Sequence, residues 1–387
     1  MTLRVLSIFG TRPEAVKMSP IVQSLAQAPG GDSLGCVTAQ HRQMLDQVLE
    51  LFNIIPEVDL NLMQPDQSLA NLTAEIFTHL DPVLARLRPD WILVQGDTTT
   101  VMASALAAFY RQIRVGHVEA GLRTNDKWQP FPEEINRRVA SVVTDLHFAP
   151  TEWSRQNLLS ENIPSDRVIV TGNPVIDALY AVVKMPPSPA VLKLFKRIDL
   201  PYRSDRPLLK PGIGSPRLVL VTAHRRENFG KPLEDICLAL KKLSQMYGNG
   251  LRIVYPVHLN PNVQEPVYRL LGEIKNITLL PPLDYLPMVH LMKHATLVLT
   301  DSGGLQEEAP ALGIPVLVMR RVTERPEGIQ AGTVRLVGTD ADEILTQTCR
   351  LLDDQHAYAA MAQAINPYGD GKAAIRITDA ILNAPVL

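Results

Sequence analysis

The stretch TDSGGLQEEA, residues 300–309, carries residue types that suit an anion-binding site. It follows the apolar run 295–299, which predicts a strand, and its Gln-Glu-Glu predicts the start of a helix. A plain surface turn needs one glycine, whereas Gly303 and Gly304 together would let a phosphate approach backbone N–H groups at a helix N-terminus. Ser302 adds a hydroxyl. We therefore predict that this strand–loop–helix unit binds a diphosphate.

Carboxylates and an arginine surround this predicted phosphate site. Glu307 and Glu308 lie on the first predicted helical turn, and one of them could accept two hydrogen bonds from a vicinal diol, as ribose requires. For Glu307 we favour stabilisation of the helix dipole instead. The segment RRVTERPEG, residues 320–328, follows a further apolar run and adds Arg325. This half of the chain is therefore expected to hold a nucleotide.

Two further strand ends in the same half carry histidines. In LVTAHRRENFG, His224 stands beside arginines directly after a predicted strand, so an anion is its natural partner, although capping of an unrelated loop is the alternative. In YPVHLNPNV, His258 and Asn260 give a weaker signal of the same kind. The nine histidines show no metal-binding spacing, so we predict no required metal.

The first half of the chain supplies carboxylates at its predicted strand ends. GDTTT, EAGLRT and PFPEEINRR bring Asp97, Glu119 and either Glu133 or Glu134 to one rim. Such a group could supply a general base or acid. The alternative is ion pairing with nearby arginines, namely Arg123, Arg137 and Arg138.

The segment GTRPEAVKM, residues 10–18, follows the first predicted strand. Gly10 permits a turn, Pro13 suits the first helical position, and Arg12 and Lys17 place cations near the helix start. This pattern predicts a phosphate site, with a capped surface helix as the alternative. There is no GxGxxG or Walker sequence, so hydride transfer through bound NAD is not supported, and we predict no cofactor.

Alternating strands and helices must position these residues. Short apolar runs separated by helical patterns, such as 13–27 and 69–87, predict βαβ units with parallel sheets. The predicted strands are 4–9, 34–38, 91–95, 114–119, 146–149 and 168–171, then 218–222, 251–255, 277–280, 297–300 and 316–319.

We expect two doubly wound Rossmann-like domains facing a central cleft. Between residues 185 and 216 lie seven of the 31 prolines, which predicts an interruption of regular secondary structure between the two domains. The expected divisions are a first domain with the carboxylates (1–180), a Pro-rich linker (181–216), a nucleotide-binding domain (217–366), and a C-terminal helical segment that packs back on the first domain (367–387).

Composition limits the partners. The 387 residues are 46% apolar and 20% charged, with a net charge of −2, so no bulk positive field favours nucleic acid or an anionic membrane. The three cysteines, Cys36, Cys237 and Cys349, lie far apart and are expected to be buried thiols in a reducing compartment. We expect a soluble, cytoplasmic protein.

The motifs resemble those of the bacterial non-hydrolysing UDP-N-acetylglucosamine 2-epimerases. The matching segments run in order from residue 8 to residue 372: GTRPEAVKM, QHRQMLDQ, QGDTTT, HVEAGLRT, PFPEEINRR, TAHRRENFG, PVHLNP, LTDSGGLQEEAPALGIPVLVMR, TERPEG and NPYGDG. The resemblance implies a glycosyltransferase-B-like fold, a homodimer, and interconversion of UDP-GlcNAc and UDP-ManNAc without a redox cofactor. It also implies supply of ManNAc to surface polysaccharide.

The resemblance also implies roles for residues. The family is thought to eliminate UDP across C1–C2, leaving 2-acetamidoglucal, and then to add UDP back with the proton on the opposite face. Asp97, Glu119 and Glu133 match the acid/base and sugar-site carboxylates, without deciding which removes the proton. The remaining matches are Arg12, Lys17 and His224 near the diphosphate, Arg225 beside them, Ser302, Gly303 and Gly304 for phosphate, Glu308 for ribose and Arg325 for the nucleotide.

Some members of the family bind a second UDP-GlcNAc as an activator. The matching positions are all present: Gln40, Gln43, Glu133, Arg225 and His258. However, Asp66 stands where activated members place an arginine, and an acid there would repel a diphosphate, which argues against activation. Met288 replaces an aromatic residue expected near the uracil.

Three alternatives remain at this stage. A hydrolysing epimerase would release ManNAc and UDP, although the EAGLR segment after His117 favours the non-hydrolysing type. A nucleotide-sugar glycosyltransferase would share the fold, but the three carboxylates favour proton chemistry. A catalytically silent UDP-sugar sensor would show no proton exchange at C2.

Overall fold

The computed structural model describes residues 2–38, 42–62, 67–203 and 216–384. Its internal contacts divide the chain into two compact units. Unit 1 comprises Met1–Tyr180 with Tyr368–Leu387, and unit 2 comprises Ala181–Pro367. The first division falls inside helix α7 (Pro174–Val183).

Unit 1 is built on a parallel sheet. Among the described residues, seven strands lie in the order β3-β2-β1-β4-β5-β6-β7. Their bounds are β1 Leu3–Phe9, β2 Gly31–Val37, β3 Val58–Asp59, β4 Trp91–Gln95, β5 Arg114–Val118, β6 Leu146–Ala149 and β7 Val168–Val170. The strand order reverses between β1 and β4, and ligands of doubly wound sheets bind at the carboxyl ends of strands beside such a switch point.

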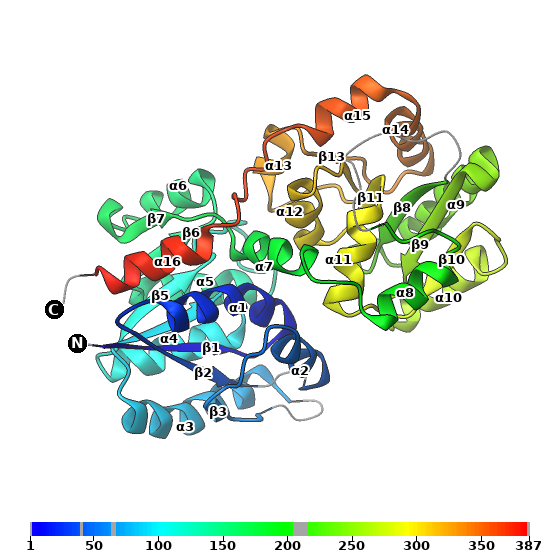
Figure 1. Cartoon of the computed structure of the whole chain (residues 1–387). Helices are drawn as coiled ribbons and strands as arrows, with labels where there is room; N and C mark the ends of the chain where they lie inside the picture. The colour runs from blue at the N-terminus through cyan, green and yellow to red at the C-terminus, as the bar shows by residue number, and fades with distance from the viewer. Residues whose placement is uncertain (1, 39–41, 63–66, 204–215, 385–387) are drawn as a thin grey trace. The chain divides into compact units, whose positions relative to one another are not determined.

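Helices cover both faces of this sheet (Figure 1). One group contains α3, α4 and α5, and another contains α1 with α2 and α16. Their bounds are α1 Arg12–Gln27, α2 Arg42–Leu51, α3 Leu69–Leu87, α4 Thr99–Tyr110, α5 Glu133–Val143, α6 Glu152–Ser160 and α16 Ala373–Leu382. Burial from both sides explains why strands such as β1 and β4 read as continuous apolar runs. Leu6, Ile8, Ile92 and Val94 form part of the core under α3 and α4.

Unit 2 repeats the arrangement. Among the described residues, six strands lie in the order β10-β9-β8-β11-β12-β13, with the switch point between β8 and β11. The strand bounds are β8 Arg217–Thr222, β9 Leu251–Pro256, β10 Ile277–Leu280, β11 Leu297–Thr300, β12 Val316–Val318 and β13 Val334–Leu336. The helices are α8 Pro189–Arg197, α9 Lys231–Tyr247, α10 Pro261–Leu271, α11 Tyr285–His294, α12 Gly303–Ala311, α13 Pro326–Gln330, α14 Ala341–Asp353 and α15 Gln355–Ala362.

These two doubly wound units confirm the predicted fold class, whereas the expected cleft stays a prediction. The structure differs from the predicted linker, because 181–203 group with unit 2 and include α8. Ser188 caps α8, and its face with Val191, Leu194 and Phe195 is buried, so the prolines flank a regular helix. The rest of the proposed linker, from 204 to 215, lies outside the described residues.

The C-terminal helix returns to unit 1. Asp177 accepts hydrogen bonds from the backbone N–H groups of Ala373 (3.2 Å) and Ala374 (3.0 Å) at its start. Thr378 Oγ1 donates to Ser24 Oγ of α1 over 2.9 Å. In the part of the chain that the structure describes, no helix has both the length and the apolar character needed to cross a bilayer.

Candidate active site

Glu119 directly follows β5 in unit 1, and the side chains that hold it include Lys17, Asn173 and Gln95. The buried residue has a φ of +62°, a left-handed conformation that turns the chain sharply after the strand. Lys17 Nζ lies 2.7 Å from both carboxylate oxygens, Asn173 Nδ2 donates over 2.7 Å, and Gln95 Nε2 also donates. Arg123 pairs with Glu161 and not with Glu119, with two contacts of 2.8 Å. The alternative of ion pairing with arginines does occur elsewhere in the group, because Arg137 pairs with Asp97 and Glu134, and Arg138 pairs with Glu134. The structure therefore joins the predicted residues Glu119 and Lys17.

Asp97 follows the neighbouring strand β4 and can change its protonation near neutrality. Burial raises the pKa of Asp97 to about 6, Arg137 opposes this shift, and the charges of Glu119 and Glu133 add to it. Arg137 Nη2 lies 3.5 Å from Asp97 Oδ2. Nε2 of His117 lies 2.7 Å from the carbonyl oxygen of Gly96, the residue before Asp97. This hydrogen bond fixes the turn that follows β4. A carboxyl group with such a pKa suits general acid–base catalysis.

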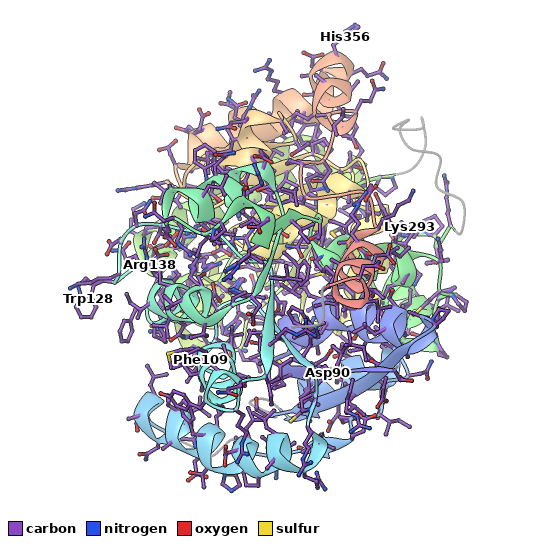
Figure 2. The ribbon with its side chains drawn as sticks, turned by 90° about the vertical axis from the view of Figure 1, so that its left-hand side faces the viewer. Asp90, Phe109, Trp128, Arg138, Lys293 and His356 are labelled. Carbon is purple, nitrogen blue, oxygen red and sulfur yellow. The ribbon has the colours of Figure 1, made fainter. Side chains whose placement is uncertain are left out.

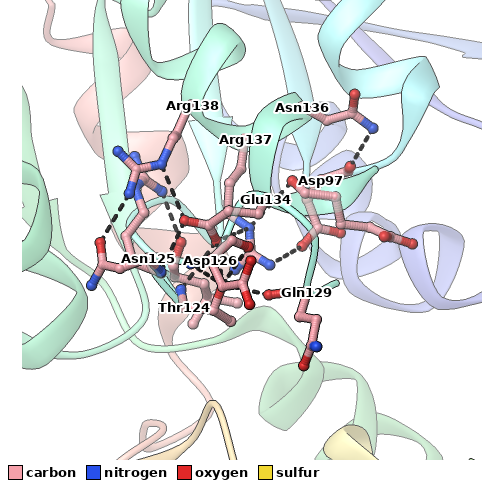
Figure 3. Close-up of polar contacts among 12 residues, drawn as sticks. Asp97, Thr124, Asn125, Asp126, Gln129, Glu134, Asn136, Arg137 and Arg138 are labelled. Atoms are coloured by element: carbon pink, nitrogen blue, oxygen red, sulfur yellow. Dashed lines mark hydrogen bonds and ion pairs between the residues drawn. The ribbon is translucent and has the colours of Figure 1, made fainter. Parts of the chain in front are cut away.

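The adjacent residues Glu133 and Glu134 have different environments. Glu134 accepts from the Thr124 N–H (3.0 Å) and the Asn125 N–H (3.2 Å), and Arg138 Nε donates to it over 3.1 Å (Figure 3). Glu133 Oε2 is buried without a hydrogen-bond partner among the described residues. Glu134 therefore stabilises the loop before α5. Glu133 has an oxygen that could accept a hydrogen bond or a proton from a ligand.

The turn after β1 differs from the predicted phosphate site. Glu14 accepts hydrogen bonds from the backbone N–H groups of Gly10 (2.7 Å) and Thr11 (2.8 Å), and the Thr98 hydroxyl donates to its other oxygen. These N–H groups are thus occupied, so any phosphate contact from this turn must come from side chains such as Arg12. Sequence reasoning missed Glu14, although Thr11 and Glu14 have the spacing of a capping box, which the structure forms.

The switch point of unit 2 contains a second buried carboxylate that sequence reasoning missed. Asp301, directly after β11, accepts from the backbone N–H groups of His224 and Arg225, each over 2.8 Å. His224 Nδ1 lies 3.2 Å from Asp301 Oδ1, so the anion expected beside this histidine is present within the protein itself. His258 stacks on His224, with ring centroids 5.5 Å apart and an interplanar angle of 12°.

The TDSGG segment corrects the predicted helix start. Helix α12 begins at Gly303 and not at Gln306, so both glycines lie in its first turn. A Cβ on Gly303 would come within 2.6 Å of Arg325 Nη1, which explains the first glycine. A Cβ on Gly304 would meet only Glu308 Oε2, at 3.5 Å. The Ser302 side chain does not cap the helix.

Arg325 is fixed by acids around this helix start. Its Nε donates to Glu307, and its Nη1 lies 2.6 Å from Glu324 Oε1. Glu307 therefore acts as an ion-pair partner, which corrects the favoured reading of helix-dipole stabilisation alone. Glu308 accepts a hydrogen bond of 2.7 Å from the Tyr285 hydroxyl of α11. Arg325, Ser302 and Glu308, predicted to bind the nucleotide, thus gather at one end of α12.

The candidate activator site is only partly described. His258 lies on His224, and Arg225 Nη2 is 3.9 Å from Glu324 Oε1. Gln40, Asp66 and the side chain of Gln43 lie outside the described residues.

Comparison with known proteins places the chain in a family. The family model described as "UDP-N-acetylglucosamine 2-epimerase" matches residues 23–382. A relative of that name from Escherichia coli K12 is 54% identical over 381 residues, which cover 98% of this chain and 99% of the relative. The chain belongs to the UDP-N-acetylglucosamine 2-epimerase family. This confirms the recognition made from the motifs and the enzyme class, an isomerase.

Solved structures agree with this family and fold. A UDP-GlcNAc 2-epimerase from Neisseria meningitidis, solved bound to UDP-GlcNAc, has a TM-score of 0.87 and 47% identity, covering 98% of this chain and 100% of its own. A glycosyltransferase from Rickettsia africae matches with a TM-score of 0.61 at 13% identity, covering 99% of this chain and 100% of its own, and supports the glycosyltransferase-B-like fold alone.

Proposed function

We propose that this epimerase-family chain interconverts UDP-GlcNAc and UDP-ManNAc without net hydrolysis. The observation that carries the proposal is the carboxylate group at the end of the first sheet, where Asp97 titrates near neutrality beside Glu119 and Glu133. The chain shares 54% identity with an E. coli relative named "UDP-N-acetylglucosamine 2-epimerase".

The reaction requires two proton transfers at C2 and a departing diphosphate. A base removes the C2 proton, the C1–O bond breaks, and its electron pair goes to the β-phosphate oxygen of UDP, leaving 2-acetamidoglucal. UDP then adds back to C1, and an acid delivers a proton to the opposite face of C2. We assign the two proton transfers to Asp97 and Glu133, because Asp97 titrates near neutrality and Glu133 keeps a buried oxygen without a partner. Glu119, already bonded by three side chains, would position the sugar.

Unit 2 would hold UDP. The N-terminus of α12 presents backbone N–H groups at Gly303 and Gly304, which favour the diphosphate. Arg225 and Arg325 add positive charge, and Glu308 would accept hydrogen bonds from the ribose. This support for the leaving group matters because charge develops on UDP in the transition state.

The product distinguishes this function from its nearest alternative. Purified protein is incubated with UDP-GlcNAc, and the products are separated by anion exchange. UDP-ManNAc at equilibrium with UDP-GlcNAc is expected. Accumulation of free ManNAc and UDP in equal amounts would establish the hydrolysing reaction instead, and no turnover would exclude both.

The homodimer and the polysaccharide pathway, which the family implies, and the cytoplasmic location, expected from the sequence, stay predictions. Whether a second UDP-GlcNAc activates the chain is a separate question. Activation can be tested by adding a trace of UDP-GlcNAc to reactions started with UDP-ManNAc. We expect no stimulation in the wild type and stimulation in Asp66→Arg, because the substitution replaces a repulsive charge with an attractive one. A variant that gains no response would count against this argument.

A further inference from the structure

The carboxylate of Asp301 is anchored on one side. Its Oδ2 accepts the backbone N–H groups of His224 and Arg225, and the Asn228 side-chain amide donates to it over 3.1 Å. Asp301 is fully buried at the end of β11. Three donors converging on a single oxygen fix the plane of the carboxylate, because rotation would leave buried N–H groups without an acceptor.

The second oxygen of Asp301 faces the imidazole of His224. Oδ1 lies 3.2 Å from Nδ1 and has no other polar partner among the described residues. Burial alone would raise the pKa of Asp301, but the interaction with His224 and the backbone donors lower it below its usual value. The oxygen is therefore an anionic acceptor in a buried setting, where leaving it unmatched would be costly.

The ring of His224 is restrained on its face as well. His258 stacks on it with an interplanar angle of 12°. With Nδ1 directed at Asp301, the other ring nitrogen, Nε2, points away from the carboxylate. Among the described residues Nε2 has no hydrogen-bond partner, and the side chain is 37% exposed. Ser302 and the start of α12 follow Asp301 directly in the chain.

We propose that Asp301 is a positioning residue that fixes His224 with its Nδ1–H toward the carboxylate and its Nε2 toward the bound diphosphate. The role rests on the proposed function: His224, as the imidazolium, would donate its Nε2–H to the β-phosphate oxygen that receives the electron pair of the C1–O bond. Asp301 supplies the countercharge for the imidazolium and excludes the other tautomer of the neutral ring. It touches no substrate.

The tautomer can be measured without any turnover. Protein carrying ¹⁵N-labelled histidine is studied by long-range ¹H–¹⁵N NMR, and the His224 signals are assigned as those lost in His224→Gln. We expect a protonated Nδ1 in the wild type, whether the ring is neutral or cationic. An Nδ1 without a proton would overturn the proposal.

Asp301→Asn tests the coupling. The amide oxygen can still accept from the backbone N–H groups, while its NH₂ group would face Nδ1. The variant therefore loses both the acceptor for Nδ1–H and the countercharge of the imidazolium, and a neutral ring donates more weakly to the leaving group. We expect kcat to fall by about 10²-fold or more, with KM changed by less than about threefold, because the ring orientation acts in the chemical step.

A double-mutant cycle separates positioning from a purely structural role. If Asp301 acts through His224, Asp301→Asn should slow the His224→Gln variant by no more than about twofold. Asn228→Ala removes one of the donors that hold the same carboxylate, so whatever effect it has should likewise shrink in the His224→Gln background. A full multiplicative loss for Asp301→Asn in the His224→Gln background would overturn the proposal.

The two proposals can fail independently. A wild-type protein that forms no UDP-ManNAc would overturn the proposed function, and the proposal on Asp301 would then be tested by the NMR measurement alone. The NMR result on the wild type decides the position of the His224 proton in either case, even if Asp301→Asn does not fold.

Discussion

Carboxylates of the same chemical type have different tasks in this chain because their neighbours differ. Glu119 is bonded to Lys17, Gln95 and Asn173, whereas Asp97 has the more distant Arg137 at 3.5 Å. Burial raises the pKa of Asp97 to about 6, and Arg137 offsets this shift only in part. The same position that suits Asp97 for proton transfer should therefore cost stability.

This cost gives a pH prediction for Asp97. Its folded pKa of about 6 exceeds the ordinary value of an aspartate, 3.8, so the folded state binds more protons between these values. The free energy of unfolding should fall as pH rises from about 4 to about 6. Asp97→Asn resembles the neutral form and should be more stable than the wild type at pH 7 by about 1–3 kcal/mol, while turnover falls. Urea denaturation between pH 4 and 7 measures both effects, and a less stable variant with unchanged pH dependence would contradict the argument.

Glu133 and Glu134 offer a matched pair of substitutions. Glu133→Gln should lower kcat by about 10²–10⁴-fold with little change in stability, because its buried oxygen lacks a partner. Glu134→Gln should instead lower the free energy of unfolding by about 2–4 kcal/mol, because it leaves Arg138 and two backbone donors poorly matched. Steady-state kinetics and denaturant unfolding of both variants provide the test. Equal kinetic losses would refute the division of roles.

At the scale of the elements, the start of helix α12 requires a glycine at position 303, because a side chain there would collide with Arg325. Gly303→Ala would place Cβ 2.6 Å from Arg325 Nη1, an atom held by Glu324. We expect a loss of about 1–3 kcal/mol in stability and weaker UDP binding. Gly304→Ala is the control for stability, because its Cβ has room and alanine favours helix. Thermal unfolding of the two variants should separate them, and equal melting temperatures would show that the contact with Arg325 does not matter.

The β1–α1 turn depends on Glu14 in a similar way. Glu14→Ala removes the acceptor of the Gly10 and Thr11 N–H groups, so the free energy of unfolding should fall by about 2–4 kcal/mol. Glu14→Gln keeps one oxygen and should lose less. Denaturant midpoints for the two variants decide the point; a glutamine variant as unstable as the alanine variant would mean that charge, and not hydrogen bonding, holds the turn.

Strands and helices were largely predictable from the sequence because both sheets are buried on two faces. Strand β4 and helix α3 have the predicted bounds, since apolar runs and helical periodicity do not overlap there. The short strands β3 and β13 were missed because their sequences, VD and VRL, include a charged residue and form no apolar run, unlike the equally short β7 and β12. The start of α12 was misplaced because glycine ordinarily disfavours a helix, and the contact that requires Gly303 comes from Arg325, 22 positions along the chain.

The candidate site was predictable only in part. Strand ends identified Asp97, Glu119 and His224, because parallel topology brings them to the carboxyl edge of each sheet. Nothing in the sequence indicates the role of Asp301, because its partners are backbone N–H groups 76 and 77 positions earlier in the chain. Such contacts leave no pattern in the sequence. For Glu14, by contrast, the spacing from Thr11 does predict a capping box, so its role in the turn could have been predicted from the sequence.

At the scale of the whole molecule, the two units share a structural feature: in each, a buried carboxylate connects the segments that follow the two strands of the switch point. In unit 1, Glu14 joins the turn after β1 to Thr98 after β4; in unit 2, Asp301 joins the segment after β8 to the end of β11. These carboxylates accept hydrogen bonds from backbone N–H groups at the switch points, so these N–H groups are not available to bind an anionic ligand. In unit 2 this leaves the start of α12 as the proposed phosphate site.

The C-terminal helix completes unit 1, although 187 residues of unit 2 precede it, the length of Ala181–Pro367. Ile381 of α16 is fully buried, with its Cδ1 near Gly116 of β5. Ile381→Ala should raise hydrogen exchange in β5 and α1 while exchange in unit 2 stays unchanged. Ile375→Ala, at a position 55% exposed on the same helix, should change neither. Faster exchange in both units of Ile381→Ala would show that they unfold together.

The central claim is proton exchange at C2 without net loss of UDP. Proton NMR of the purified protein with UDP-ManNAc in D₂O tests it most directly. We predict that UDP-GlcNAc forms with deuterium at C2, that recovered UDP-ManNAc gains deuterium as well, and that free UDP stays below the enzyme concentration. UDP-GlcNAc that keeps its C2 proton, or stoichiometric release of UDP and ManNAc, would contradict the account.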